Sequence, residues 1–256
     1  MMHHLLSPQG ELALAAALAR RPLLAFDFDG TLAPIVARPG DARLSVAVAR
    51  RLEKLSRRLP VAVVTGRGVD DVSARLQFRP HYVVGNHGAE DEQAPVPAVA
   101  MREALQPLRD RLYRMAESLE AVGVEVEDKG FSIALHYRCA RDQTHARALI
   151  TSLLRRPGEH TRIFGGKRVV NVMAADAPDK ADAVERLVSR AGTGAAVYMG
   201  DDVNDEVVFE RAPAHWLTVR VGRDDPHSNA GFFLDSSAEV GIVLHKMLEC
   251  LGEVDG

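Results

Sequence analysis

Short, continuously apolar runs alternate with helical segments in the first part of the chain, and this alternation restricts the fold more than any other feature. The apolar runs lie at 22–28 (PLLAFDF), 60–65 (PVAVVT) and 82–85 (YVVG), and helical spacing lies between them at 45–59 and near 69–77. Short apolar runs without polar alternation are typical of strands buried on both faces. Strands that alternate with helices form a parallel sheet. The chain therefore predicts an α/β core with a doubly wound parallel sheet.

The middle of the chain has a different pattern. Residues 93–99 (QAPVPAV) contain two prolines and are typical of a linker. Helices are expected over about 101–121 and near 142–155, and hairpins at 123–127 with 131–138 and at 161–164 with 168–173, with turns at Asp128-Lys129-Gly130 and Gly165-Gly166. The order α-β-β-α-β-β predicts an antiparallel sheet backed by two helices, which we interpret as an inserted α+β domain at 99–174.

The α/β alternation resumes after this insert. Residues 1–98 and 175–256 are therefore expected to form one core, with helices near 179–191, 203–211 and 238–250 and strands at 195–199 and 216–221.

Composition excludes several classes of partner. The 32 Lys and Arg residues nearly balance the 35 Asp and Glu residues, and a formal net charge of −3 does not favour nucleic acid or an acidic membrane surface. No apolar run approaches the roughly 20 residues that a membrane span needs. The only cysteines, Cys139 and Cys250, are too few for a disulfide framework and suit a reducing compartment. Since no basic leader or heptad pattern is present, we expect a cytoplasmic monomer.

Two acids follow the first strand, in Asp27-Phe28-Asp29-Gly30-Thr31. Carboxylates this close repel each other unless one is protonated or a cation lies between them. A solvated turn is the alternative, because Asp-Gly is a common turn pair. Ligands of open α/β sheets bind beyond the carboxyl ends of strands, so this position favours a functional site.

Two weaker clusters occupy equivalent positions. Thr65-Gly66-Arg67 follows the second strand and offers a hydroxyl, a flexible backbone and a fork of donors to an anion, although a helix-capping Thr explains it equally well. Lys180 follows Pro178-Asp179 at a predicted helix start, where a lysine is usually on the surface.

The most acidic cluster is Gly200-Asp201-Asp202-Val203-Asn204-Asp205-Glu206, after the strand AAVYM. Four acids in this short segment are costly to hold together without a cation. Carboxylate ligands without Cys or His favour Mg²⁺ over Zn²⁺. Part of the cluster can instead cap the following helix, because acids favour helix N-termini.

As a set and in this chain order, the four clusters resemble the haloacid dehalogenase (HAD) superfamily of phosphotransferases, which implies a HAD-like, Rossmann-type core. The resemblance implies that Asp27 is a nucleophile that forms an aspartyl-phosphate and that Asp29 is the general acid/base. Thr65 and Lys180 would hold the phosphoryl oxygens. Mg²⁺ would be bound by Asp27, Asp201 and the backbone carbonyl of Asp29, with support from Asp202 and Asp205.

The insert resembles the larger cap of sugar-phosphate phosphatases, and several runs resemble the trehalose-6-phosphate phosphatase family. These runs are Gly85-Asn86-His87-Gly88-Ala89-Glu90, Glu127-Asp128-Lys129-Gly130, His136-Tyr137-Arg138 and Gly166-Lys167. The resemblance implies hydrolysis of trehalose 6-phosphate to trehalose and phosphate. It implies substrate-binding roles for eight residues: Arg67, Asn86, His87, Glu127, Lys129, Arg138, Lys167 and Asn171.

The chain departs from the family pattern mainly at Asn171, where Glu is frequent, and this leaves the sugar contacts open. A phosphatase of another sugar phosphate, such as a sucrose-phosphate or mannosylglycerate-phosphate type, is one alternative. A phosphomutase-like transferase is a second. A non-catalytic receiver module also uses acids and a lysine, but such modules are near 120 residues and carry no cap.

Overall fold

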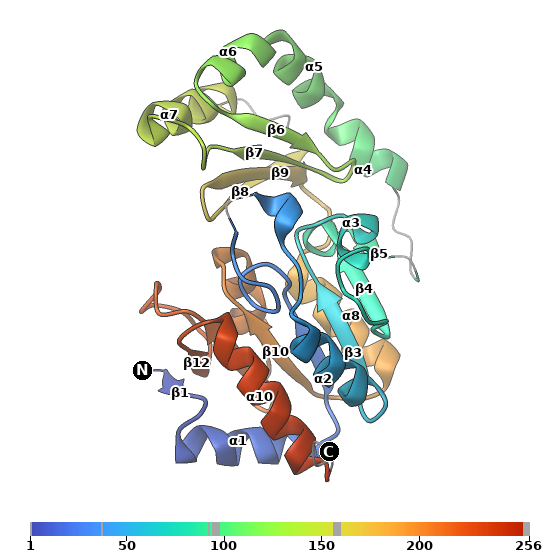
Figure 1. Cartoon of the computed structure of the whole chain (residues 1–256). Helices are drawn as coiled ribbons and strands as arrows, with labels where there is room; N and C mark the ends of the chain where they lie inside the picture. Colours follow the sequence, from blue (N-terminus) through green and yellow to red (C-terminus); the bar gives the residue numbers. More distant parts are fainter. Residues whose placement is uncertain (1, 37, 92, 94–97, 156–159, 253–256) are drawn as a thin grey trace. The chain divides into compact units, whose positions relative to one another are not determined.

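The computed structural model describes residues 2–36, 38–91, 93, 98–155 and 160–252 (Figure 1). The chain divides into two compact units, a core unit of Met1–Glu92 with Pro178–Gly256 and a second unit of Gln93–Ala177. These bounds differ by a few residues from the predicted insert at 99–174. Of the predicted linker at 93–99, residues 94–97 lie outside the described residues.

The core unit contains an eight-stranded sheet in the order β1-β12-β11-β10-β2-β3-β4-β5. All neighbouring pairs are parallel except β4 and β5. The strands are β1 (His3–His4), β2 (Leu23–Phe26), β3 (Val61–Val64), β4 (Tyr82–Gly85), β5 (Glu90–Asp91), β10 (Ala196–Gly200), β11 (Leu217–Val221) and β12 (Phe232–Leu234). The predicted doubly wound parallel core is confirmed. The sequence did not reveal β1, β5 and β12, which are two or three residues long and too short to carry a pattern.

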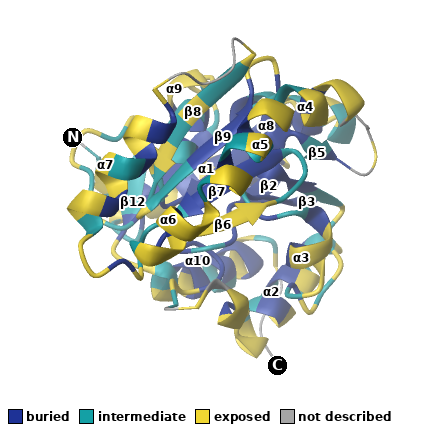
Figure 2. Ribbon diagram, turned by 90° about the horizontal axis from the view of Figure 1, so that it is seen from above, coloured by how far each residue is buried: buried dark blue, intermediate teal, exposed yellow. Residues whose placement is uncertain are grey.

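Helices cover both faces of this sheet. Side chains alternate along β2, so that Leu24 and Phe26 join one apolar cluster and Leu23 and Ala25 the other. The first cluster is shared with α1 (Pro8–Ala19), α2 (Val46–Ser56), α3 (Val69–Ser73) and α10 (Ser237–Cys250), and the second with α8 (Lys180–Ala191) and α9 (Glu206–Arg211). The central strands are consequently buried along their whole length (Figure 2). Short 3₁₀ turns complete the unit: η1 (Pro39–Asp41), η2 (Asn86–Gly88) and η3 (Val203–Asp205).

Helix α8 begins at a capping box. The carboxylate of Asp179 accepts from the backbone N–H of Asp182 at 2.8 Å, and the carboxylate of Asp182 accepts from that of Asp179 at 2.9 Å. The helix ends at Gly192, which has a left-handed φ of 65°. The capping box at Asp179 defines the start of α8 and therefore places Lys180 in its first turn.

The second unit contains an antiparallel sheet in the order β6-β7-β9-β8. Its strands are β6 (Glu125–Asp128), β7 (Ser132–His136), β8 (Thr161–Gly166) and β9 (Val169–Ala174). The turn between β8 and β9 is Lys167-Arg168 and not the predicted Gly165-Gly166, because both glycines pair with β9 and Arg168 has a φ of 63°. The predicted helix near 142–155 is α7 (Gln143–Leu153).

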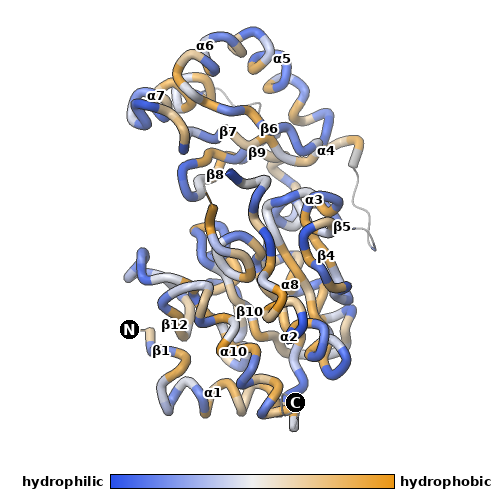
Figure 3. The backbone as a smooth tube through the Cα atoms, viewed as in Figure 1, coloured by the Kyte–Doolittle hydropathy of each residue, from blue (hydrophilic) through white to orange (hydrophobic). Residues whose placement is uncertain are grey.

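The predicted single helix over 101–121 is wrong in detail. Three shorter helices occupy this region: α4 (Ala98–Ala104), α5 (Gln106–Arg114) and α6 (Ala116–Ala121). Pro107 lies in the first turn of α5, where a missing N–H is tolerated, but it could not continue α4. Apolar residues of α5, α6 and α7 pack with Ile133, Leu135 and Val172 on one face of the sheet. Hydrophobic residues of α7 that pack on the sheet therefore alternate along the helix with hydrophilic ones (Figure 3). None of the helices within the described ranges has the length and apolar character to cross a membrane.

Two glycines of the core unit give a test of close packing. Gly88 has a φ of +113°, and a Cβ there would lie 2.2 Å from the carbonyl oxygen of Asp179. Gly192 also has a positive φ, of +65°, but a Cβ there would meet no atom within 4 Å. We expect Gly88→Ala to lower the free energy of unfolding by about 2–4 kcal/mol and Gly192→Ala by about 1 kcal/mol. Urea unfolding followed by the fluorescence of Trp216, the only tryptophan, measures both. Equal losses in the two variants would contradict the close approach at Gly88.

Candidate active site

Three neighbouring strands bring the predicted acidic and hydroxyl residues together. Asp27 directly follows β2, Thr65 follows β3 and Asp201 follows β10. The strands pair in parallel in the order β10-β2-β3, so their carboxyl ends meet at one edge of the sheet. This is the edge at which open α/β sheets bind ligands.

A cluster of buried carboxylates lies at this edge. Carboxylate oxygens of Asp27, Asp201 and Asp205 lie within 4.8 Å of one another, and the three residues are only 6%, 2% and 0% exposed. The Lys180 ammonium lies 3.1 Å from Asp27 Oδ1 and 2.7 Å from Asp205 Oδ1. One buried cation therefore faces two of three clustered acids.

Burial and charge change the titration of this cluster. Desolvation raises the pKa of Asp27 well above its usual range; Lys180 opposes this rise, and the neighbouring acids add to it. Desolvation disfavours the charged form of Lys180, but Asp205 and Asp27 outweigh it and raise the pKa of the lysine. The two carboxylates therefore favour the charged form of Lys180.

Both carboxylate oxygens of Asp205 accept hydrogen bonds from groups of the chain itself. Its Oδ1 accepts from Lys180 and, at 2.6 Å, from the hydroxyl of Tyr198, and its Oδ2 accepts from the backbone N–H of Asp202 at 2.9 Å. The carboxylate of Asp202 in turn accepts from Val203 N at 2.8 Å and begins η3. Asp205 and Asp202 thus hold Lys180 and the 201–205 loop in position. The sequence did not reveal the role of Tyr198, which looks like an ordinary core residue of β10.

The remaining acids suit a divalent cation. Asp27 and Asp201 offer hard carboxylate oxygens, which Mg²⁺ prefers. Gly30 allows Asp201 to approach, because a Cβ on Gly30 would lie 2.1 Å from Asp201 Oδ2 and because Gly30 has a φ of +83°. A cation between Asp27 and Asp201 would relieve their repulsion and favour the ionised form of both. The residues present therefore fit a Mg²⁺ site.

Asp29 lies beside this cluster and forms a bidentate ion pair with Arg67. Arg67 Nε donates to Asp29 Oδ2 at 2.6 Å, and Nη2 donates to Oδ1 at 2.7 Å. The third nitrogen of the guanidinium, Nη1, donates to Asp71 Oδ2 at 2.7 Å. The Arg67 fork, which we predicted to bind substrate, thus bonds to carboxylates of the chain itself.

Asn86 and His87, also predicted to bind substrate, contact the Thr65–Arg67 loop. Both have positive φ, 48° and 56°. The backbone N–H of Asn86 donates to Arg67 O at 2.8 Å, and that of His87 donates to Thr65 O at 2.9 Å. The Asn86 amide donates to Glu90 Oε2 at 2.7 Å. The sequence did not reveal the role of Glu90, although this residue lies in the run Gly85–Glu90.

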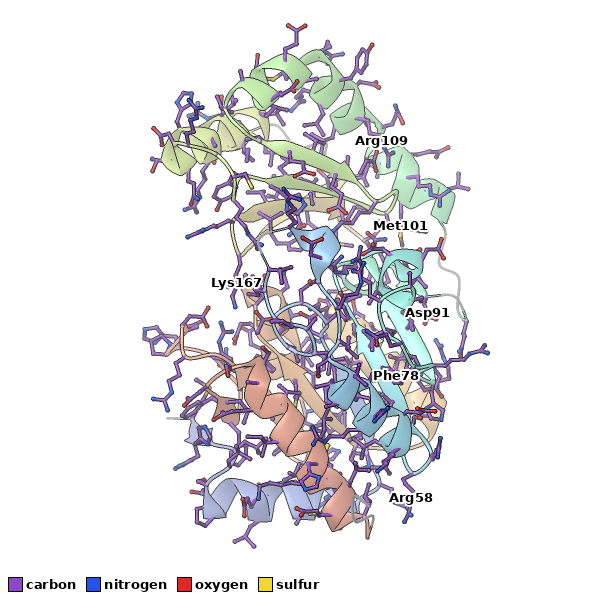
Figure 4. The ribbon with its side chains drawn as sticks, viewed as in Figure 1. Arg58, Phe78, Asp91, Met101, Arg109 and Lys167 are labelled. Atoms are coloured by element: carbon purple, nitrogen blue, oxygen red, sulfur yellow. The ribbon has the colours of Figure 1, made fainter. Side chains whose placement is uncertain are left out.

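The five predicted sugar-binding residues lie in the second unit. Glu127 Oε2 lies 2.9 Å from His136 Nε2 and 3.4 Å from Lys129 Nζ. Desolvation opposes ionisation of Glu127, but His136 and Lys129 outweigh it and lower its pKa. Arg138 donates to the carbonyl of Lys167 at 3.4 Å, and Lys167 lies at the turn between β8 and β9 (Figure 4). The sequence did not identify His136 as a site residue, because its contact with Glu127 forms across two strands.

Strand register brings four of the side chains of this unit to one face. Ala134 on β7 lies directly opposite Glu127 on β6 and Asn171 on β9. Asn171 in turn lies directly opposite Phe164 on β8. Opposite residues share a face, and this face is the reverse of the one on which α5, α6 and α7 pack. His136 lies two residues from Ala134 and shares the same face. This face therefore carries four side chains: the Glu127 carboxylate, the Asn171 amide, the His136 imidazole and the Phe164 ring.

A comparison with known proteins identifies the family of the chain. The family model described as trehalose-phosphatase matches residues 25–238. The trehalose-phosphate phosphatase of Mycolicibacterium paratuberculosis is 32% identical over 93% of this chain and 64% of its own length. That of Mycobacterium tuberculosis is 31% identical over 94% of this chain and 65% of its own length. The chain thus spans less than two thirds of the length of these relatives.

Solved structures share the fold. The C-terminal domain of the trehalose-6-phosphate phosphatase of C. albicans has a TM-score of 0.80 and 20% identity, with 99% of both chains covered. The sucrose-phosphatase of Synechocystis has a TM-score of 0.58 and 19% identity, with 90% of this chain and 98% of that chain covered. The solved structures thus show that the chain has a HAD-like fold. The match over residues 25–238 shows that this chain belongs to the trehalose-phosphatase family.

Proposed function

We propose that this protein is a Mg²⁺-dependent phosphatase that hydrolyses trehalose 6-phosphate to trehalose and phosphate. The observation that carries the proposal is the position of Asp27, a buried carboxylate that touches Lys180 and lies beside Asp201. A carboxylate nucleophile at a cationic site is what two-step phosphoryl transfer requires. Family membership supports the same reaction.

In the first step, an oxygen of Asp27 attacks phosphorus while the bond between phosphorus and the sugar oxygen breaks. Asp29 delivers a proton to the departing sugar oxygen, and trehalose leaves. In the second step, Asp29 takes a proton from a water molecule, whose oxygen attacks the phosphorus of the aspartyl-phosphate while the bond between phosphorus and the Asp27 oxygen breaks. Inorganic phosphate leaves, and both carboxyl groups return to their starting states.

Lys180 and Thr65 hold the phosphoryl group during both steps. Lys180 supplies a fixed positive charge next to Asp27, and Thr65 supplies a buried hydroxyl at the end of β3. Phosphoryl transfer depends mainly on such positioning and on neutralisation of the oxygen charges. Asp27, Asp201 and the backbone carbonyl of Asp29 are the proposed Mg²⁺ ligands, with Asp202 and Asp205 as their support. When bound, Mg²⁺ would add positive charge opposite the phosphoryl oxygens.

We propose that the insert at 99–174 selects the sugar. Trehalose is neutral and rich in hydroxyl groups, so its recognition needs both donors and acceptors. The proposed contacts are Glu127, Lys129, Arg138, Lys167 and Asn171, and the shared face of Glu127 and Asn171 supports this assignment. We further propose that the protein acts in the cytoplasm as a monomer, without nucleic-acid or membrane partners. The two exposed free cysteines suit a reducing compartment.

A panel of sugar phosphates, assayed with Mg²⁺ by release of phosphate, tests the reaction. We expect trehalose 6-phosphate to be among the best substrates by kcat/KM.

Asp27→Asn keeps the side-chain volume and removes the attacking charge, so turnover should fall by more than about 10³-fold in a folded protein. A clear preference for sucrose phosphate would overturn the choice of sugar, and near-wild-type activity of Asp27→Asn would overturn the nucleophile.

Thermal unfolding tests the metal site without an activity assay. At about 100 times its Kd, Mg²⁺ should stabilise the wild type by about 2.7 kcal/mol and raise its Tm by several degrees. Asp201→Asn should abolish this rise without lowering the Tm of the metal-free protein, because it removes one of the repelling charges. Glu120→Gln is the control, since Glu120 lies on α6 and belongs to neither of the acidic clusters. A full Mg²⁺ shift in Asp201→Asn would exclude Asp201 as a ligand.

Glu127→Gln tests the proposed sugar contact. A charged hydrogen bond contributes about 1.5–3 kcal/mol, so kcat/KM for trehalose 6-phosphate should fall by roughly 10- to 100-fold. The kcat/KM for 4-nitrophenyl phosphate, which carries no sugar, should stay within about twofold. Glu120→Gln, on α6, is the control. Equal losses on both substrates would remove Glu127 from the sugar site.

A further inference from the structure

Arg67, at the end of the Thr65–Arg67 loop, has an unusual environment. Its side chain is only 10% exposed, and all three of its nitrogens donate to carboxylates, Nε and Nη2 to Asp29 and Nη1 to Asp71. Burial opposes the charge of Arg67, but the two carboxylates outweigh it and raise its pKa. The fork-to-fork geometry with Asp29 fixes the plane of that carboxylate, which a single hydrogen bond would not do.

The side chain of Arg67 is held from behind. Asp71 accepts from Arg67 and also from Arg75, whose Nε lies 3.0 Å from both Asp71 oxygens. Burial opposes ionisation of Asp71, but Arg75 and Arg67 together lower its pKa. Arg75 Nη1 donates to the carbonyl of Gly40 at 2.7 Å, and the Arg67 guanidinium lies 5.4 Å from the centre of the Phe28 ring. Arg67 therefore has partners that fix its position before any substrate binds.

The backbone of Arg67 is fixed as well. Its carbonyl accepts from Asn86, and its N–H donates to the Thr65 hydroxyl at 3.3 Å. The left-handed conformations of Asn86 and His87 make this contact possible, and such conformations persist only where the surroundings enforce them. The His87 ring lies against Gly66, where a Cβ would approach its Cε1 to 2.4 Å. The η2 turn is thus a rigid support for the Thr65–Arg67 loop.

From this geometry we infer that Arg67 is a positioning residue for Asp29, and that it acts through the fixed orientation of that carboxylate and not through a contact with the phosphate. The inference rests on the proposed phosphatase reaction, in which Asp29 exchanges a proton with the leaving sugar oxygen. It also gives Asn86 and His87 a role as supports of Arg67 in place of substrate contact.

The dependence of kcat/KM on the leaving group separates this role from phosphate binding. A sugar alkoxide needs a proton as it departs, whereas 4-nitrophenolate departs without one. Arg67→Lys keeps the charge but cannot form the fork, and Arg67→Met removes both. We expect each variant to lose about 10²-fold or more in kcat/KM on trehalose 6-phosphate but less than about tenfold on 4-nitrophenyl phosphate. The inhibition constant of inorganic phosphate should not change.

Two further variants act as controls. Arg190→Met removes a comparable pair, since Arg190 Nη2 donates to Asp91 on β5 at 2.7 Å (Figure 4), and it should leave the ratio of the two substrates unchanged. Asp29→Asn removes the carboxylate that Arg67 is inferred to orient. Adding Arg67→Lys to Asp29→Asn should therefore cause little further loss on trehalose 6-phosphate.

The outcomes are distinct. Equal losses on the two substrates, a weaker inhibition by phosphate, or additive losses in the double variant would overturn the inference while the phosphatase function stands. If Arg67→Met does not fold, Arg67→Lys and Asp71→Asn carry the same test. A wild type that hydrolyses no phosphomonoester would overturn the proposed function and this inference with it. If trehalose 6-phosphate is merely the wrong sugar, the best sugar phosphate of the panel replaces it.

Discussion

The buried contact of Lys180 with Asp27 and Asp205 is the interaction on which the rest of the site depends. Three carboxylates in so small a volume repel one another, and removing one partner from a buried ion pair typically costs about 3–5 kcal/mol. Lys180 can supply the compensating charge because the capped start of α8 holds it at the edge of the sheet. The helix cap, the lysine and the acids therefore form one structural unit, although they are far apart in the sequence.

Charge alternates outward from this centre. On one side Asp205 connects Lys180 with Tyr198 and with the backbone of the 201–205 loop. On the other side Asp29, Arg67, Asp71 and Arg75 alternate acid and base as far as the carbonyl of Gly40. The acids and bases named here thus have partners within the chain on both sides of the proposed nucleophile. Such preorganisation favours electrostatic catalysis, because the groups need not reorient when charge develops.

Much of this could be predicted from the sequence. The parallel core follows from short apolar strands, and the position of Asp27, Thr65 and Asp201 follows from the rule that polar residues after parallel strands meet at one edge. Helix breaks near Leu105 and Met115 were not predicted, because the apolar spacing continues through them. The roles of Tyr198, Glu90 and His136 could not be predicted either, since each becomes important through a partner distant in the chain or across a strand.

The sequence by itself determined the fold class, the αββαββ insert and the set of residue types that suit phosphoryl transfer, because these depend on periodicity and on the order of motifs. Only the tertiary structure decided which of those residues touch. Arg67 could equally bind an anion or a carboxylate, and its pairing with Asp29 depends on the distance between two loops that follow different strands. Coulombic and hydrogen-bonding energies fall steeply with distance, so composition and spacing cannot choose between such partners, whereas packing of the sheet and its loops does.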